Sequence, residues 1–295
     1  MPELPDLTVY LERLDAFARG ARLTGLRIGN PFVLRTVSPA PADFSGHRLT
    51  GTRRMGKRLV LEFDGARYAV IHLMRLGRLQ WNKPGVALPR GKGLAAFDFD
   101  TGTLLLVEHG GRHRASLHLV AGREALQAFA RDGIEVLEAS FDAFAARLRS
   151  RNHTLKRALT DADVVAGIGN AYSDEILHRA RLSPFRQTQA LDDAEMQRLF
   201  DAAQAIVREW TGRLRREAGD GWPAKVTAFR PQMAVHGRYR QPCPDCGAPV
   251  QRIVYADSEA NYCARCQTAG RLLADRALSR LLKANWPKTL DELDR

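Results

Sequence analysis

Four cysteines near the C-terminal end constrain the fold of this chain more than any other feature of its sequence. They form the pattern C-x2-C-x16-C-x2-C, at Cys243, Cys246, Cys263 and Cys266. Two close pairs on separate turns can each supply two thiolates to one tetrahedral zinc ion. Two disulfides are the alternative, but the N-terminus MPELPDLTVY lacks a basic leader and an apolar signal core, which predicts a reducing compartment. We therefore predict one zinc ion, structural because four protein ligands leave no position for water.

The charge of the chain indicates a polyanionic partner, and we predict nucleic acid rather than a membrane surface. The 45 Lys and Arg residues against 33 Asp and Glu give a net charge of +12. Basic residues gather in segments that lack acids, and Arg238, Arg240 and Arg252 flank the cysteine loop. With 45% hydrophobic residues the composition is globular, and no apolar run approaches the roughly 18 residues of a membrane span. We predict a soluble, cytoplasmic monomer, associated with the nucleoid if the source is bacterial.

The hydrophobic periodicity changes twice along the chain. Apolar residues from 7 to 17 recur at helical spacing, and Gly20 stands where a helix end is expected. Short β-rich runs follow between residues 23 and 120, such as 59–63 and 68–74, and they predict hairpins of a β-sandwich or barrel. Beyond residue 121 the period is helical. A second, mostly α-helical domain should therefore begin near residue 130.

The second residue carries an unusual chemical possibility. Removal of Met1, favoured before a residue as small as Pro2, would leave a free secondary amine whose pKa near 8 keeps a neutral fraction at pH 7. Such an amine can attack an electrophilic sugar carbon to form an iminium ion, and the neighbouring Glu3 can transfer protons. The alternative is an ordinary frayed chain end.

A glycine-rich turn, Gly167 to Asn170, precedes a predicted helix. The free N–H groups of a helix start can bind a phosphate. A tight turn between helices, with Asn170 as the cap, explains the same residues without any ligand.

Taken together, these motifs resemble the formamidopyrimidine-DNA glycosylase and endonuclease VIII family of bifunctional DNA repair enzymes. The resemblance runs almost from end to end, and the motifs occur in the family's order. They are PELPD at 2–6, GKRL at 56–59, HLMRLGRL at 72–79, LKRALTD at 155–161, AGIGNAYSDEILHRARLSP at 166–184, VHGRYRQPCPDCG at 235–247 and YCARCQ at 262–267.

The resemblance implies an α+β fold, with an N-terminal helix plus β-sandwich and a C-terminal helix-two-turn-helix domain that carries a four-cysteine zinc finger. The implied domains are an N-terminal catalytic β-sandwich domain at 1–125, a helix-two-turn-helix DNA-binding domain at 130–232, the zinc finger at 235–270 and a C-terminal tail at 271–295. It also implies a DNA-binding cleft between the two domains, into which the damaged nucleotide is turned out of the duplex.

The resemblance implies roles for individual residues as well. The catalytic set is Pro2 as the Schiff-base nucleophile at C1′, Glu3 as the acid/base group that opens the sugar, and Lys57 as the proton donor associated with β-elimination. The implied partner is double-stranded DNA that contains damaged bases or abasic sites. The residues expected to contact that DNA are His72, Arg112, Lys156 and Asn170, together with Met74 as the wedge that fills the space of the extruded base, for which Arg75 is the competing candidate.

Several positions depart from the family's pattern. Ser258 stands where the family has a zinc-finger arginine that assists δ-elimination, so this step is uncertain here. Position 6 is Asp6 where glutamate is usual, His113 replaces an aromatic wedge, and residues 217–229 fall where some members carry a lesion-capping loop.

Three functions follow as hypotheses. The first is a bifunctional glycosylase and abasic-site lyase acting on oxidised bases. The second, which Ser258 favours, is a damage- or structure-specific DNA-binding protein with weak or lost excision. The third is a zinc-ribbon nucleic-acid protein unrelated to repair, which leaves PELPD and the glycine-rich turn unexplained.

Overall fold

The structure of this protein is a computed structural model of residues 1–295. It describes all residues except 111–113, 225, 228, 256–257, 275, 284–286 and 294–295. The chain forms two compact units, one made of residues 1–131 and 210–227 and the other of residues 132–209 and 228–295. The division differs from the four predicted segments in that residues 210–227 group with the first unit and the cysteine-bearing segment groups with the helices of the second.

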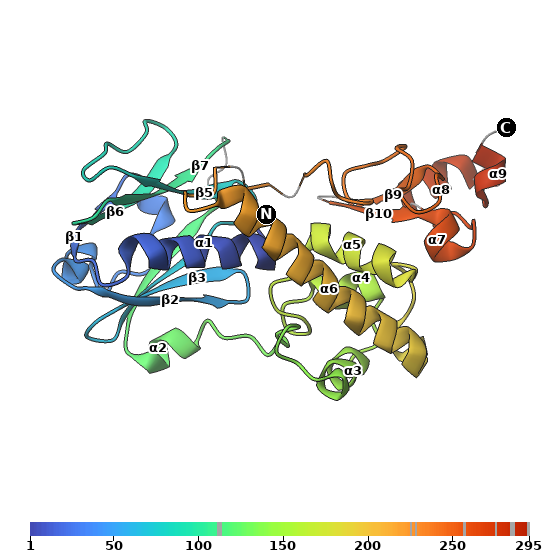
Figure 1. Cartoon of the computed structure of the whole chain (residues 1–295), viewed down its shortest axis with the longest axis horizontal. Coiled ribbons are helices and arrows are strands. Elements are labelled where there is room, and N and C mark those ends of the chain that lie inside the picture. The colour runs from blue at the N-terminus through green and yellow to red at the C-terminus, as the bar shows by residue number, and fades with distance from the viewer. Residues whose placement is uncertain are drawn as a thin grey trace. The chain divides into compact units, whose positions relative to one another are not determined.

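The first unit opens with α1 (Leu4–Ala18), which lies alongside β2 (Figure 1). Leu7, Tyr10, Leu14 and Ala18 are three or four residues apart and all are buried, so one stripe of the helix faces the core. Pro5 stands in the first turn, where its missing N–H would have no intrahelical partner.

Eight strands of the first unit form two antiparallel four-stranded sheets that enclose one hydrophobic core with α1. One sheet has the order β1-β6-β7-β5 and the other the order β2-β3-β4-β8. The predicted β-sandwich is therefore confirmed. The elements are β1 (Leu23–Ile28), η1 (Pro31–Val33), η2 (Pro41–Phe44), β2 (Leu49–Met55), β3 (Arg58–Phe63), β4 (Arg67–His72), β5 (Gly77–Asn82), β6 (Gly93–Phe99), β7 (Thr103–Glu108), β8 (Ser116–Ala121) and α2 (Arg123–Gln127).

The second unit combines helices with a two-stranded zinc-finger hairpin, and α4 and α5 pack together with β10 beside α5 (Figure 1). The long helix α6 begins in this unit and contributes its last residues, from Trp210, to the first. None of the described helices is long and apolar enough to cross a membrane. The elements are α3 (Phe141–Arg149), α4 (Leu155–Thr160), α5 (Asn170–Ala180), η3 (Thr188–Ala190), α6 (Asp193–Ala218), β9 (Val250–Val254), β10 (Glu259–Cys263), α7 (Ala264–Thr268), α8 (Arg276–Leu282) and α9 (Leu290–Leu293).

Candidate functional site

The N-terminus is built into the protein and is not a frayed end. Pro2, Glu3 and Asp6 are all buried. The main-chain N–H of Glu3, which precedes α1 in an extended conformation, donates to Oδ2 of Asp6 at 3.1 Å. Asp6 thus holds the residue before the helix, a role for which its short side chain suffices.

Charged side chains from two hairpins act on the terminal amine, which in this structure belongs to Met1. Burial lowers the pKa of this amine below its ordinary value of 8.0, and the cations Arg78 and Lys57 act in the same direction. The carboxylates of Glu3 and Asp6 oppose them. The fold therefore brings Lys57 into electrostatic range of the amine and of Glu3, although more than 50 residues separate them in sequence.

Lys57 occupies the tip of the hairpin between β2 and β3. Met55 pairs with Arg58, which leaves a two-residue loop of Gly56 and Lys57. Gly56 has a φ of +60°, a left-handed conformation that glycine adopts without strain and that two-residue hairpins require. The glycine of the GKRL motif therefore places the lysine at the tip.

His72 ends β4 in a group of cations. Burial, together with the charges of Arg58, Lys57 and His118, lowers the pKa of His72 from 6.5 to about 4. The imidazole is therefore neutral at pH 7. A neutral donor surrounded by positive side chains is suited to an anion such as a phosphate, because the imidazole adds a hydrogen bond without adding repulsion among the cations.

Met74 lies in a strained turn between β4 and β5. Its φ of +52° is left-handed, which is rare for a residue with a Cβ. The turn is closed by the N–H of Gly77, which donates to the carbonyl of Leu73 at 2.9 Å, and a Cβ at Gly77 would lie 2.3 Å from that oxygen. Met74 is partly exposed and Arg75 is exposed, which leaves both candidates for the wedge at the surface.

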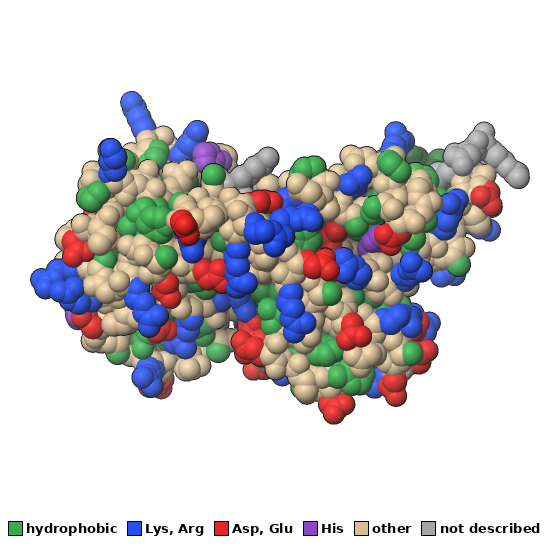
Figure 2. Space-filling model, in the orientation of Figure 1, with side chains coloured by type: hydrophobic (Ala, Val, Ile, Leu, Met, Phe, Trp, Pro, Cys, Tyr) green, Lys and Arg blue, Asp and Glu red, His purple; other side chains and the backbone are tan. Residues whose placement is uncertain are grey.

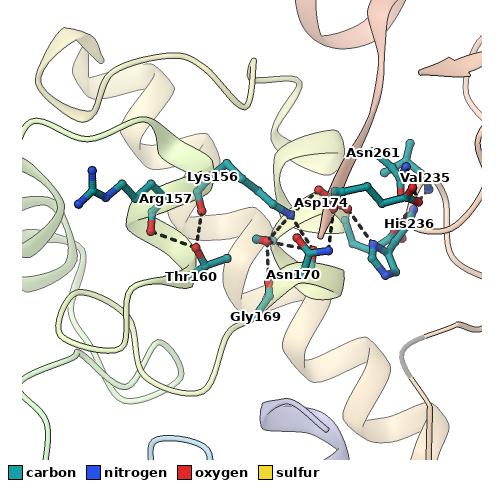
Figure 3. Close-up of polar contacts among 12 residues, drawn as sticks. Lys156, Arg157, Thr160, Gly169, Asn170, Asp174, Val235, His236 and Asn261 are labelled. Carbon is teal, nitrogen blue, oxygen red and sulfur yellow. Dashed lines mark hydrogen bonds and ion pairs between the residues drawn. The ribbon is translucent and has the colours of Figure 1, made fainter. Parts of the chain in front are cut away.

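Lys156 and Asn170 meet at the start of α5 (Figure 3). The ammonium of Lys156 donates to the Asn170 carbonyl at 2.7 Å, to Oγ of Ser173 at 2.8 Å and to Oδ1 of Asp174 at 2.5 Å. These three partners take all three of its protons, and the Lys156 side chain is only 9% exposed. The predicted DNA contact of Lys156 stays untested, but the geometry gives this side chain an internal, positioning role.

Asn170 is partly exposed as the first residue of α5. Its Nδ2 donates to the main-chain carbonyl of Glu259 on β10 at 2.7 Å. The side chain predicted to bind phosphate is thereby fixed between the helix start and the zinc-finger hairpin, next to the positive end of the helix dipole.

Two buried acids on α5 tie the helix to the segment before the first cysteine. The Glu175 carboxylate accepts the main-chain N–H groups of Ala234, Val235 and His236 at 2.7 to 3.0 Å. Oδ2 of Asp174 contacts Nδ1 of His236 at 2.7 Å (Figure 3). Sequence reasoning missed both acids, although acids on a helix that is otherwise buried must find partners.

The four cysteines converge on one point. Their sulfur atoms all lie within 4.8 Å of one another, with 3.4 Å between Cys246 and Cys263 and 3.9 Å between Cys243 and Cys266. A tetrahedral zinc ion with bonds of about 2.3 Å requires sulfurs about 3.8 Å apart. The site therefore fits zinc, and its four thiolates leave no coordination position open.

His178 of α5 supports this sulfur cluster from outside. Its Nε2 lies 3.2 Å from Sγ of Cys243, and the side chain is 4% exposed. We expect His178→Phe to retain zinc about 10 to 100 times less tightly, because the thiolate loses its hydrogen bond. His178→Gln, which keeps an N–H donor, is the matched control. Zinc release to a coloured chelator measures the difference, and equal release rates for all three proteins would contradict it.

Three further residues were singled out in the sequence: Arg112, His113 and Ser258. Arg112 and its neighbour His113 lie outside the described residues. Ser258 is exposed immediately before β10, and its carbonyl accepts the N–H of Tyr255 at 2.7 Å.

Two described residues after α6, Trp222 and Val226, lie in the stretch where some family members carry a lesion-capping loop, and both belong to the first unit. Trp222 donates from Nε1 to the Leu79 carbonyl at 2.8 Å, and its ring lies 5.6 Å from that of Tyr10. Val226 joins the hydrophobic core. Trp222 is thus an anchor that sequence periodicity did not reveal.

One face of the molecule carries basic and acidic side chains together. On the face shown in Figure 2, Lys and Arg side chains are interspersed with Asp and Glu. The net charge of +12 therefore does not make this face a continuous basic surface.

Three family models match successive parts of the chain. The formamidopyrimidine-DNA glycosylase N-terminal domain matches residues 1–113, the H2TH domain of the same enzymes matches 133–212, and a zinc finger found in FPG and IleRS matches 240–269. A formamidopyrimidine-DNA glycosylase of Mycobacterium sp. (strain JLS) is 32% identical over 298 residues, which cover 92% of this chain and 99% of that protein. The chain belongs to the formamidopyrimidine-DNA glycosylase family. It is a DNA glycosylase of this family with an H2TH domain and a zinc finger, as the sequence predicted.

Other proteins of this family are similar to the chain in sequence or in structure. An uncharacterised formamidopyrimidine-DNA glycosylase-like protein of Mycobacterium tuberculosis is 41% identical over 151 residues, or 51% of this chain and 94% of that one. The crystal structure of MutM (Fpg) from Thermus thermophilus is 31% identical with a TM-score of 0.74, covering 90% of this chain and 98% of that one. A Lactococcus lactis Fpg solved with abasic-site DNA shares the fold, with a TM-score of 0.79, 22% identity, and 90% and 99% coverage.

Proposed function

We propose that this glycosylase is bifunctional: it excises oxidised bases from double-stranded DNA and then cleaves the strand at the abasic site. The observation that carries the proposal is the N-terminal segment, in which Pro2 and Glu3 are buried and the pKa of the partly buried Met1 amine is lowered beside Glu3 and Lys57. The same surroundings would favour the neutral, nucleophilic form of the Pro2 amine. A structural zinc ion, held by the four cysteines, would stabilise the finger and take no part in the chemistry.

The reaction follows from the groups at this end of the chain. After loss of Met1, the nitrogen of Pro2 attacks C1′ of the damaged nucleoside, and the bond from C1′ to the base breaks. The base leaves with the proton that the attacking nitrogen gives up. Glu3 donates a proton to the ring oxygen, the sugar opens, and the nitrogen becomes an iminium ion. This cation acidifies the C2′ hydrogen, whose loss expels the 3′ phosphate in β-elimination, with Lys57 as the associated proton donor.

The remaining predicted contacts supply the DNA binding. We assign His72 and Asn170 to backbone phosphates, with Lys156 holding Asn170 in place, and Met74 to the space left by the extruded base. Structures of Lactococcus lactis Fpg with THF-DNA and with DNA that contains an abasic site support DNA as the partner, and we propose that the partner of this chain is double-stranded.

Borohydride trapping of the wild-type protein tests the proposal. Duplexes with an abasic site, 8-oxoguanine or an oxidised pyrimidine are incubated with protein and borohydride, and the cleavage ends are resolved on a gel. A covalent adduct is expected, and the reactive duplex identifies the lesion class. The end chemistry shows whether δ-elimination occurs with Ser258 at the usual arginine position.

A second candidate function is favoured by Ser258 alone. A damage- or structure-specific DNA-binding protein of this fold would bind the same duplexes tightly without trapping or base release. That result would replace the glycosylase proposal with the binding function.

A further inference from the structure

A tight turn on the zinc finger carries an arginine where folding favours glycine. The turn spans Arg238 to Gln241 and is closed by the N–H of Gln241, which donates to the Arg238 carbonyl at 2.9 Å. Arg240, its third residue, has a φ of +66°. Glycine is preferred at such a position because a Cβ is strained there. Asparagine is the next choice, since its short side chain can form local hydrogen bonds. Arg181 is also left-handed, but it ends α5, where a cation faces the negative end of the helix dipole. Arg240 ends no helix.

The side chain of Arg240 shares an aromatic ring with a second arginine. Its Cζ lies 5.2 Å from the ring centroid of Tyr239, and Cζ of Arg252 lies 4.3 Å from the same centroid. Arg252 projects from β9 and is exposed, as is Arg240. Two cations are therefore held at one ring by cation–π contacts, despite their mutual repulsion.

Carboxylates balance this pair of cations only in part. Oε2 of Glu259 lies 3.5 Å from Nη1 of Arg252, a long contact between two partly exposed side chains. Within the part of the chain that the structure describes, no carboxylate forms an ion pair with Arg240. An external anion would relieve the repulsion that the fold leaves uncompensated.

Glu259, the first residue of β10, connects Arg240, Tyr239 and Arg252, here called the stack, to the start of α5. Glu259, which contacts Arg252 with its side chain, accepts the side-chain N–H of Asn170 with its main-chain carbonyl at 2.7 Å. The stack thus neighbours the residue that we assign to a DNA phosphate, on a surface of the same unit.

We propose that Arg240, Tyr239 and Arg252 form a second phosphate-binding site, which holds a DNA backbone phosphate near the one at Asn170. Guanidinium groups match phosphate oxygens with pairs of parallel N–H donors, and the Tyr239 ring keeps both groups oriented for this contact. This inference rests on the proposed function, in that it requires the chain to bind DNA. It adds a contact that carries affinity without reading sequence.

The test is the salt dependence of DNA binding by the full-length, zinc-loaded protein. Fluorescence anisotropy gives Kd for a duplex with a tetrahydrofuran abasic analogue between 50 and 200 mM NaCl. Each of Arg240→Gly and Arg252→Gln should raise Kd at low salt and reduce the slope of log Kd against log salt by about 0.9. The advantage of the wild type over each variant should then shrink about threefold across this range.

Arg240→Gly offers a sharp internal control, because glycine suits the left-handed turn. The variant should melt at or above the wild-type temperature while it binds DNA more weakly, so misfolding would not explain the loss. Arg181→Gly removes the same charge at another left-handed position and should leave the salt slope unchanged. Tyr239→Leu keeps the net charge but releases both arginines, and it should weaken binding as well.

Three outcomes would overturn the proposed site. The first is a wild-type Kd and slope for Arg240→Gly and Arg252→Gln. The second is an equal loss of affinity in Arg181→Gly, since the effect would then be one of net charge. The third is loss of zinc in the two variants with unchanged DNA binding, since the arginines would then serve the thiolate cluster. Failure of the wild type to bind the duplex at all would instead contradict the proposed function.

Discussion

A protein that begins at Pro2 is expected to form a borohydride-trapped adduct with abasic-site DNA, whereas the same chain extended by a few residues before Met1 should form none. In the extended chain the nitrogen of Pro2 is an amide, which has neither the basicity nor the free lone pair to attack C1′. Gel mobility measures the adduct, and mass spectrometry of the digested adduct locates it. Equal adduct yields from the two proteins would place the nucleophile on a lysine and contradict the assignment of Pro2.

The matched variant for this experiment is Glu3→Gln, which removes the proton donor and leaves the amine. Excision of a damaged base should fall about 10²- to 10⁴-fold, the usual contribution of a positioned acid. Trapping on a preformed abasic site should persist, because that sugar opens to its aldehyde without the enzyme. Pro2→Gly adds a further control: its imine can lose its proton, so strand cleavage should be slower than with the iminium ion of proline.

The pH dependence of trapping has a predicted direction. A protonated amine cannot attack, so the rate should rise with pH and level off once the amine is neutral. Burial lowers the pKa of the Met1 amine below 8.0, and Arg78 and Lys57 act in the same direction. We expect the same direction for the amine of Pro2 once Met1 is removed, because it lies one residue away. Levelling should therefore begin below pH 8.0. Arg78→Gln removes one of these cations and should move the profile toward higher pH.

Local sequence was sufficient to predict most elements of the fold. The runs at 59–63 and 104–108 lie within β3 and β7, because β-branched and apolar residues between turn signals have few alternatives to a strand. The zinc site was predictable for a similar reason, since the cysteine spacing alone limits the geometry. The assignment of residues 210–227 to the first unit was not, because it depends on contacts such as that of Trp222 with Leu79, 143 residues away in sequence.

The sequence did not predict which of the charged side chains are buried. Lys156 and Arg240 are both basic residues in basic stretches of the sequence. The Lys156 ammonium is enclosed by three protein acceptors, whereas the Arg240 side chain is exposed at a strained turn. Asp174 and Glu175 look like the solvated face of a helix and are instead its buried links to residues 234–236. The residue type alone gives the charge of a side chain, whereas its desolvation depends on the residues that pack around it in the fold.

Lys156→Met is expected to lower the free energy of unfolding by about 3 kcal/mol, the low end of the usual cost of breaking a buried ion pair, because the Asp174 carboxylate keeps its contact with His236. Asp174 is 1% exposed, and the Lys156 ammonium at 2.5 Å is its closest cation. Denaturant unfolding followed by tryptophan fluorescence measures the loss. The variant should also bind DNA less well, because the carbonyl of Asn170 loses its contact with Lys156.

The double variant Lys156→Met with Asp174→Asn separates the ion pair from simple packing. Removing both charges should restore a large part of the lost stability, since no uncompensated carboxylate then remains in the core. DNA affinity should recover less than stability, because the contact to Asn170 is still missing. If the double variant is less stable than Lys156→Met alone, the ion pair is not what holds the start of α5. If affinity recovers together with stability, Lys156 stabilises the fold without positioning Asn170.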